Sequence, residues 1–274
     1  MVQKIKQILE SPAQKKAYNE QLFATVAPRY DVITKILSFG CDGYWKKKLV
    51  QSLPTFNTSP RLSAEATQER RLEESHSDVS RGTPNNYEKT CADLACGTGD
   101  ITFLLAEKYP EYHIDGIDLT ESMLIRARQK LAHKNSLNNI SFTQADMCLL
   151  PYSNQSIDII TGGYALRNAP SLEHAIIELS RVLKPGGTAA FLDFSKPKNK
   201  ILQKISYYLL KFWGSVWGIL LHGDHTVYSY IAESLALYPD RQALKLLLEK
   251  HGLCVQKSKL FFCGFLELLV CTKI

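Results

Sequence analysis

The segment CADLACGTGD, residues 91–100, places two glycines and two aspartates where a strand-to-helix turn could hold a small molecule. Gly97 and Gly99 allow the backbone to turn tightly and to approach a ligand without a Cβ atom in the way. The apolar run at 101–109 predicts a helix, whose first backbone amides would face polar groups of that ligand. An ordinary strand-to-helix turn can carry the same residues, so the segment needs support from its neighbours.

Asp118 supplies this support. The run YHIDGI at 112–117 predicts a second strand, and Asp118 follows it directly before a predicted helix at 121–130. An acidic residue about 20 residues after the first turn suits a ribose site, because its carboxylate can accept hydrogen bonds from both ribose hydroxyls. The dinucleotide fingerprint G-x-G-x-x-G lacks its third glycine here, which disfavours a pyrophosphate.

The spacing D-x-x-x-G-x-G of Asp93, Gly97 and Gly99 resembles motif I of the S-adenosylmethionine-dependent methyltransferases. In that motif the turn takes the amino-acid end of the cofactor, and the resemblance implies that Asp118 holds the ribose. S-adenosyl-L-methionine is therefore the expected cofactor.

Strands and helices alternate from residue 140 onward. Strands are expected at 140–145, 156–161 and 188–193, a helix at 172–183 that Lys-Pro-Gly-Gly ends, and a closing hairpin at 255–262 and 265–272. This alternation predicts an α/β fold with a doubly wound, mostly parallel sheet and a ligand at its carboxyl edge. A structural cap or salt bridge would explain any one polar residue there. Four polar residues that converge on this edge indicate a cleft instead: Asp93, Asp118, Asp146 and Arg167.

The chain divides into three regions. Residues 1–54 predict a helical cap of short amphipathic helices, broken at Gly40 and Gly43. Residues 55–90 hold few large apolar side chains, which predicts a polar, mobile insertion. Residues 91–274 are expected to form the ligand-binding domain.

Within that domain, residues 197–251 predict a helical lid. Apolar side chains recur at helical spacing between 201 and 220. They suit either the core side of the lid or a lipid-facing interfacial helix. Lys204 and Lys211 interrupt the run and argue against a membrane span.

Composition sets the remaining limits. With 274 residues, 45% of them hydrophobic and 22% charged, the chain can bury a full core. A net charge of +6 permits contact with an anionic membrane surface or nucleic acid; since no RNA-binding motif accompanies it, no nucleic-acid partner is expected. The seven cysteines form no C-x-x-C pair and the N-terminus has no apolar signal segment, which predicts a cytoplasmic protein with reduced thiols. His222 and His225 lack further ligands nearby, so no metal is expected.

Longer motifs resemble one methyltransferase family. The segments FATVAPRYD at 23–31, SFG at 38–40 and WK at 45–46 resemble the N-terminal signature of the UbiE/MenG C-methyltransferases of ubiquinone and menaquinone biosynthesis. Later segments resemble that family too: LRN at 166–168, RVLKPGG at 181–187 and YSYIAES at 228–234. The chain departs from the family pattern at a few positions: Thr34 for asparagine, Asp42-Gly43 for histidine-arginine, Cys96 for a frequent glycine and Gly163 for a frequent serine.

The resemblance implies a seven-stranded class I methyltransferase sheet and C-methylation of a reduced polyprenyl quinone precursor. That substrate is demethylmenaquinol, a benzoquinol of the ubiquinone pathway, or both. Peripheral contact with the inner face of the membrane and a homodimer are further expectations.

The resemblance also assigns residues. Cofactor contacts are expected from Asp93, Gly97, Thr98, Gly99, Asp118, Asp146, Met147 and Gly163, with 146–147 near the adenine. Arg167 is the expected catalytic residue, because a guanidinium is too basic to accept a proton but can stabilise a phenolate. Substrate contacts are expected from Tyr30, Asp31, Tyr164 and Asn168.

Three alternatives stay open on the sequence. A small-molecule O- or N-methyltransferase would share the cofactor half. An RNA methyltransferase would suit the basic charge. A protein that binds S-adenosylmethionine without turnover, as a scaffold in a quinone-biosynthesis complex, would carry the same motifs.

Overall fold

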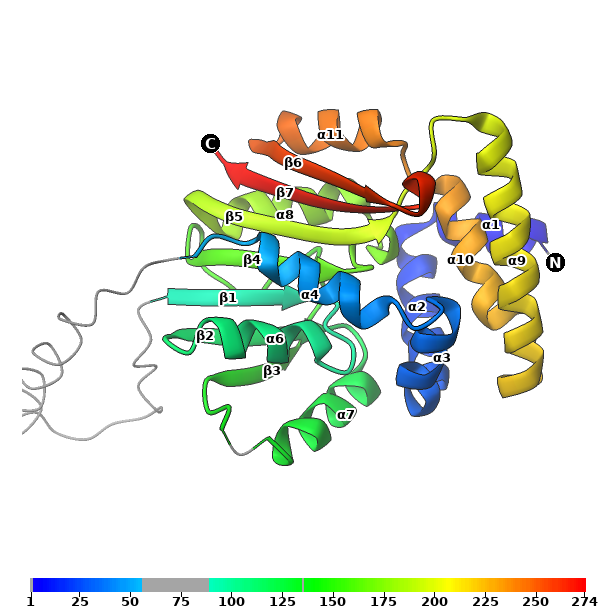
Figure 1. Ribbon diagram of the computed structural model, residues 1–274. Helices are drawn as coiled ribbons and strands as arrows, with labels where there is room; N and C mark the ends of the chain where they lie inside the picture. Colours follow the sequence, from blue (N-terminus) through cyan, green and yellow to red (C-terminus); the bar gives the residue numbers. More distant parts are fainter. Residues whose placement is uncertain (1, 56–88, 135) are drawn as a thin grey trace, which may run out of the picture.

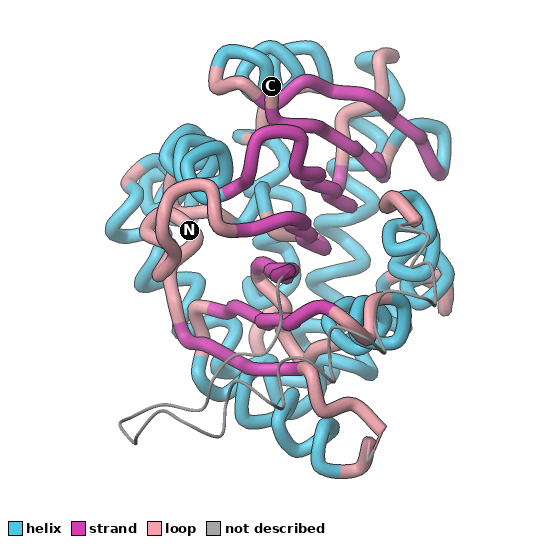
Figure 2. Tube along the Cα trace, turned by 90° about the vertical axis from the view of Figure 1, so that its left-hand side faces the viewer, coloured by secondary structure: helices cyan, strands magenta, loops and turns pink. Residues whose placement is uncertain are grey.

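A computed structural model describes residues 2–55, 89–134 and 136–274. Its centre is a seven-stranded sheet in the order β3-β2-β1-β4-β5-β7-β6, which Figure 1 shows from the side and Figure 2 after a quarter turn. β1 to β5 run parallel, and β7 pairs antiparallel with both β5 and β6. The strands are Lys89–Leu94 (β1), Tyr112–Asp118 (β2), Ile140–Gln144 (β3), Ile157–Gly163 (β4), Leu183–Phe194 (β5), Leu253–Phe261 (β6) and Leu266–Lys273 (β7). The predicted doubly wound sheet, with its closing hairpin at one edge, is confirmed.

Helices cover both faces of the sheet. One face packs against α4 (Asp42–Ser52) and α6 (Asp100–Lys108), and the other against α8 (Leu172–Val182) and α11 (Arg241–Lys250). Central strands covered on both sides need apolar side chains on both faces. Consecutive residues of β1 and β4 accordingly belong to opposite clusters and are fully buried: Cys91 and Ile159 on one face, Ala92 and Ile160 on the other.

The N-terminal cap and the C-terminal lid form one layer across the carboxyl ends of the strands (Figure 1). The layer contains α1 (Val2–Glu10), α2 (Pro12–Val26), α3 (Tyr30–Leu37), α9 (Lys200–His222) and α10 (Thr226–Leu237). Leu22 and Ile33 from the cap share an apolar cluster with Tyr230 from the lid. Between the sheet and this layer, α7 (Glu121–Ala132) contacts both β3 and α2.

Two glycines let α9 and α10 approach closely. A Cβ atom on Gly214 would lie 2.7 Å from the backbone oxygen of Tyr228, and one on Gly218 would meet the backbone oxygen of Asp224. Because backbone atoms cannot rotate away as a side chain can, these positions require glycine for the observed packing.

Several local predictions differ from the structure. Gly43 lies inside the first turn of α4 rather than ending a helix, and a Cβ atom there would meet nothing within 4 Å. β5 begins at Leu183, not at residue 188, because Leu183 already pairs with Ile157 before a bulge and renewed pairing at Thr188. α1 and α2 lie within the region predicted as a helical cap, but their bounds were not predicted from the lysine-rich N-terminus. The predicted insertion falls largely on residues 56–88, which lie outside the described residues.

We expect Gly214→Ala to lower the free energy of unfolding by about 1–3 kcal/mol, because the added methyl forces α9 from α10. Thermal unfolding measures this change. Gly43→Ala is the matched control: the same methyl in open space on a helix should stabilise the protein by about 0.5–1 kcal/mol. Equal effects of the two substitutions would contradict the close packing of α9 and α10.

Candidate active site

Two adjoining cavities lie between the sheet edge and the layer of cap and lid helices. The first, here called the polar cavity, opens at the ends of β1, β2 and β4 and holds about 630 Å³, including space open to solvent. Its lining contains most of the expected site residues: Tyr30, Gly97, Asp118, Asp146, Met147, Gly163, Tyr164 and Asn168. It also contains residues that the sequence analysis did not single out, among them Asn19, Phe23, Thr120 and Met123.

Asp118 ends β2 and joins two turns. Its Oδ2 accepts a hydrogen bond from the backbone N–H of Gly97 at 2.8 Å, and its Oδ1 accepts one from the backbone N–H of Thr120 at 2.9 Å. Burial raises the pKa of this carboxyl above its ordinary value, although the backbone hydrogen bonds lower it. Each oxygen keeps a further lone pair, so Asp118 can also accept hydrogen bonds from a ligand in the polar cavity.

Asp93 lies beneath the glycine turn rather than in the cavity lining. It is fully buried, and its carboxylate accepts hydrogen bonds from the hydroxyls of Thr102 at 2.7 Å and Thr161 at 2.8 Å. Burial raises the pKa of Asp93 to about 6, against the lowering effect of those hydroxyls. Asp93 thus ties β1 to α6 and β4, and its contact with the cofactor stays a prediction.

Thr98, Gly99 and Asp31 also lie outside the lining of the polar cavity. Gly99 precedes α6 with φ of 87°. The Thr98 hydroxyl donates to Asp31 Oδ1 at 2.7 Å, and Lys130 Nζ lies 2.8 Å from Asp31 Oδ2. These contacts fasten α3 to the turn and to α7, so direct ligand contacts by the three residues stay predictions.

Asp146 and Met147 follow β3 at the far end of the polar cavity. Asp146 Oδ1 accepts a hydrogen bond from the backbone N–H of Cys148 at 2.9 Å, while Oδ2 pairs with Lys16 of α2 at 2.9 Å. A carboxylate beside an apolar thioether suits an adenine ring, since the exocyclic amine donates and the ring face packs on the sulfur.

The second, apolar cavity lies among α2, α3, α9 and α10 and holds about 1520 Å³, including space open to solvent. Its lining is mostly aliphatic and aromatic, with Leu22, Ile33, Leu37, Trp45, Phe194, Leu209, Leu210 and Tyr228 among its members. Four residues line both cavities: Phe23, Tyr30, Tyr164 and Asn168. A group bound in one cavity can therefore meet a group bound in the other at these four side chains.

Arg167 lines the apolar cavity but is not a free charge. Its side chain is 4% exposed, its Nε lies 3.5 Å from Asp193 Oδ1, and its Nη1 donates to the Ser234 hydroxyl. Its guanidinium carbon lies 5.3 Å from the ring centroid of Phe194. Burial raises the pKa of Asp193, while the positive charge of Arg167 lowers it. Arg167 therefore forms a salt bridge that can hold this loop. It also lies at the cavity wall, where a catalytic cation is expected.

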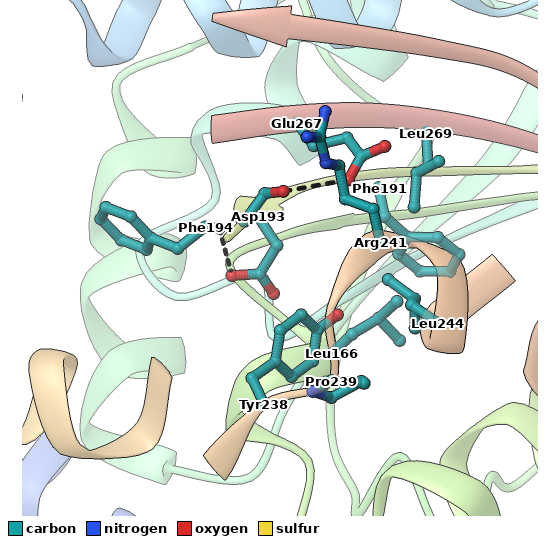
Figure 3. Close-up of a pocket in the computed structure, with 11 residues that line it drawn as sticks. Leu166, Phe191, Asp193, Phe194, Tyr238, Pro239, Arg241, Leu244, Glu267 and Leu269 are labelled. Carbon is teal, nitrogen blue, oxygen red and sulfur yellow. Dashed lines mark hydrogen bonds between the residues drawn. The ribbon is translucent and has the colours of Figure 1, made fainter. Parts of the chain in front are cut away.

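A small void behind this ion pair is not a second ligand site. Figure 3 shows it between Asp193, Tyr238 and Glu267; it holds about 290 Å³ when space open to solvent is included, as for the two cavities, but the centre of a water molecule can occupy only about 10 Å³ of it. A space of that size holds at most one water molecule. Glu267 accepts a hydrogen bond from the Ser195 hydroxyl at 3.2 Å, so its carboxylate is used within the protein.

The two histidines of the segment HGDH, 222–225, have different surroundings. His222 Nε2 lies 2.8 Å from the Tyr228 hydroxyl, and His225 lies at the exposed start of α10. Across the described part of the chain, no three His, Cys, Asp or Glu side chains gather as metal ligands would.

Comparison with known proteins decides the family. The model of the ubiE/COQ5 methyltransferase family matches residues 68–273. The chain belongs to this family. Ubiquinone/menaquinone biosynthesis C-methyltransferase UbiE of Shewanella pealeana is 32% identical over 236 residues, which cover 84% of this chain and 80% of that protein. The corresponding protein of Teredinibacter turnerae is 34% identical over 233 residues, covering 84% and 81%.

Solved structures agree on the fold of this family member. A Haloferax volcanii methyltransferase, in complex with the Trm112 methyltransferase activator, superposes with a TM-score of 0.55 at 15% identity and covers 92% of this chain and 97% of its own. An O-methyltransferase family protein from Burkholderia thailandensis gives 0.50 at 16% identity, covering 68% and 51%. The prediction of an S-adenosylmethionine-dependent C-methyltransferase with a Rossmann-like sheet is confirmed.

The polar cavity of this methyltransferase fits S-adenosylmethionine. A Cβ atom on Gly163 would come within 2.6 Å of the Ile101 side chain, so the wall there is bare backbone. The Thr120 hydroxyl is buried, lines the cavity and lies beside the Asp118 carboxylate. Together with the remaining lone pairs of Asp118, these groups suit the ribose and amino-acid portions of the cofactor.

We expect Asp118→Ala to weaken S-adenosylmethionine binding by roughly 2–3 kcal/mol, because ribose hydroxyls lose their charged acceptor. Titration calorimetry measures the affinity. Asp240→Ala is the control: Asp240 caps α11 through the backbone N–H of Ala243, so its loss should cost about 1 kcal/mol of stability and leave the affinity unchanged. Unchanged affinity of Asp118→Ala would remove this residue from the site.

Proposed function

We propose that this protein transfers the methyl group of S-adenosylmethionine to a ring carbon of a reduced polyprenyl quinone precursor. The substrate is demethylmenaquinol, a benzoquinol of the ubiquinone pathway, or both. The proposal rests on one observation: the polar cavity and the large apolar cavity share four lining residues, Phe23, Tyr30, Tyr164 and Asn168. A nucleotide-like cofactor suits the first, and an aromatic ring with an apolar tail suits the second. The relatives named above carry C-methyltransferase names from the same biosynthesis.

The protein contributes alignment and charge. The bound cofactor supplies an electrophilic methyl group on a sulfonium. When the ring carbon is held in line with that methyl, a bimolecular reaction becomes effectively unimolecular. This positioning supplies a large part of the rate acceleration. The aliphatic and aromatic lining of the apolar cavity keeps water from the reacting atoms, and hydrogen bonds fix the junction residues. Asn168 Nδ2 donates to the backbone oxygen of Tyr164 at 2.8 Å, and Asn19 Nδ2 donates to that of Asn168 at 2.7 Å.

Arg167 stabilises negative charge on the ring oxygen, which makes the ring carbon nucleophilic. Its pairing with Asp193 and Ser234 holds the guanidinium at the cavity wall. Nη1 donates to Ser234 and Nε faces Asp193 without a hydrogen bond, so the N–H donors of Nη2 can serve the substrate.

The assay is transfer of labelled methyl from S-adenosylmethionine to short-chain demethyl-quinols of both ring types, with the product located by mass spectrometry and NMR. We expect a ring-carbon methyl from the wild type and a loss of about 10²–10³ in kcat for Arg167→Gln. Arg167→Lys should restore part of the rate, since a point charge cannot reproduce the planar fork.

Arg181→Gln is the matched control, because Arg181 pairs with Glu178 away from both cavities. It should change stability without changing kcat. Methyl on oxygen, or no transfer to either ring by the wild type, would overturn the proposed function. Full kcat in Arg167→Gln would overturn only the role of Arg167.

We also propose that the protein works in the cytoplasm, in contact with the inner face of the membrane through α9. No helix in the described residues is long and apolar enough to cross a bilayer. Several apolar side chains of α9 are nevertheless exposed: Ile201, Ile205, Tyr208, Leu209, Phe212, Ile219 and Leu220. Leu209 also lines the apolar cavity, so a prenyl tail could pass from the lipid past α9. The expected homodimer stays a prediction.

We expect the double variant Tyr208→Ser/Phe212→Ser to bind anionic phosphatidylglycerol vesicles at least about tenfold more weakly, because each apolar side chain contributes roughly 1.5–3 kcal/mol when buried. Vesicle flotation measures binding. Leu149→Ser/Ile274→Ser is the control, because those side chains are as exposed but lie on other elements. Equal vesicle binding by both double variants and the wild type would exclude α9 as the contact.

A further inference from the structure

The wall of the apolar cavity contains a carboxylate that the family-based assignment does not use. Asp42, at the start of α4, is 5% exposed and lies in the cavity lining with Tyr30 and Tyr164. Among the described residues of that lining it is the acidic one, and Arg167 is the basic one. This nearly buried carboxylate lies beside the place where a quinol ring is expected, so it is positioned to take part in proton transfer.

Hydrogen bonding fixes the direction of the Tyr164 hydroxyl. Tyr164 Oη donates its one proton to Asp42 Oδ1 at 3.0 Å. The phenol oxygen can then only accept a further hydrogen bond. Since Tyr164 lines both cavities, that oxygen is placed to receive a proton from a substrate hydroxyl near the junction.

The backbone of Tyr164 is held in place as well. Its φ of 57° lies in the left-handed region, which is uncommon for a residue other than glycine. Its backbone N–H donates to the Leu192 carbonyl at 2.6 Å. Such a conformation persists only where the surrounding structure determines it, and it recurs at functional sites.

Asp42 is held from the opposite side. Its Oδ2 lies 2.5 Å from Lys46 Nζ, and Lys46 in turn lies 3.0 Å from Asp100 of α6. Burial disfavours the charge of Lys46, but Asp100 and Asp42 raise its pKa above the ordinary value. Lys46 therefore stays charged and fixes Oδ2, which leaves Oδ1 for Tyr164. The groups that contact this carboxylate are thus Lys46 and Tyr164, with Asp100 on the other side of Lys46.

We propose that Tyr164 and Asp42 form the proton-accepting couple for the substrate hydroxyl. The inference rests on the proposed function. The hydroxyl proton moves to Tyr164 Oη while the Tyr164 proton passes to Asp42 Oδ1, which leaves the ring oxygen negative. Tyr164 and Asp42 thus accept the proton, and Arg167 stabilises the negative charge that remains on the ring oxygen.

The remaining bonds balance. The ring carbon forms a bond to the methyl carbon, and the electron pair of the broken C–S bond stays on sulfur. The same ring carbon loses its hydrogen as a proton to water, which restores the aromatic ring. The couple returns its proton to the ring oxygen, so one proton is released overall and Asp42 is a carboxylate again.

The competing explanation is structural. An acidic residue in the first turn of a helix, paired with a lysine four residues later, stabilises that helix. A helix-stabilising role predicts an equal effect on all substrates. A proton-accepting role predicts an effect that depends on how acidic the substrate hydroxyl is.

The test compares Asp42→Asn and Tyr164→Phe with the wild type on short-chain demethyl-naphthoquinol analogues whose ring substituents grade the acidity of the hydroxyl. We expect Asp42→Asn to lower kcat by about 10²-fold on the parent analogue, and by less than about tenfold on the most acidic one, which ionises unaided. Tyr164→Phe should behave in the same way. The double variant should be no slower than either single variant, because both remove one function.

Asp158→Asn is the matched control, because Asp158 also pairs with a lysine, Lys184 at 2.8 Å, but lies at the opposite end of β4. S-adenosylmethionine affinity by calorimetry and thermal stability are measured on every variant. An equal loss across the acidity series, or normal kcat in both single variants, overturns the inference. If Asp42→Asn fails to fold, Tyr164→Phe alone decides it. A wild type that methylates no quinol overturns the proposed function instead.

Discussion

The buried ion pair of Arg167 and Asp193 is the interaction on which the site depends most. A charge that is removed from water is tolerated only when it is paired and hydrogen-bonded. Here the partners come from different parts of the chain: Asp193 from β5 and Ser234 from α10. The backbone oxygen of Arg167 also accepts a hydrogen bond from Lys15 of α2 at 3.0 Å. The guanidinium and the backbone oxygen of this one residue therefore bring sheet, lid and cap to the same loop.

That loop is also the boundary between the two cavities. Gly163 ends β4 at the polar cavity, Tyr164 and Asn168 line both cavities, and Arg167 lines the apolar one. The Tyr230 hydroxyl of α10 lies 2.8 Å from Asn19 Oδ1 and 3.1 Å from Asn168 Oδ1. Movement of α2 would therefore displace parts of the walls of both cavities, since Asn19 and Phe23 belong to that helix.

Much of the lining of the polar cavity could be predicted from the sequence. Gly97, Asp118 and Asp146 each lie at the end of a strand, and a parallel sheet brings strand ends together without further information. Local signals of this kind do not report tertiary partners. For this reason Arg167 was expected as a catalytic charge, a salt bridge was considered only as an alternative, and Asp193 was not named as its partner. Asn19 and Phe23 were missed because α2 has no amphipathic signal that distinguishes its cavity face.

Asp42 shows the same limit from the other side. Its place in the motif was noted from sequence, but its contact with Tyr164 joins residues 122 positions apart. Gly43 was read as a helix end because glycine is common there, whereas the open surroundings of this position tolerate it within a helix. β5 began earlier than expected because a bulge accommodates Pro185 and the glycines that follow it.

The packing of the cap against α10 has a consequence for synthesis on the ribosome. Leu22, Val26 and Ile33 find their apolar partners in Val227 and Tyr230. These partners leave the ribosome only after the whole parallel sheet except its last two strands has been made. These cap helices are thus made before the sheet but are among the last elements to acquire their native neighbours. Until then their apolar faces are open to other binding partners, including chaperones, as incomplete domains in general are.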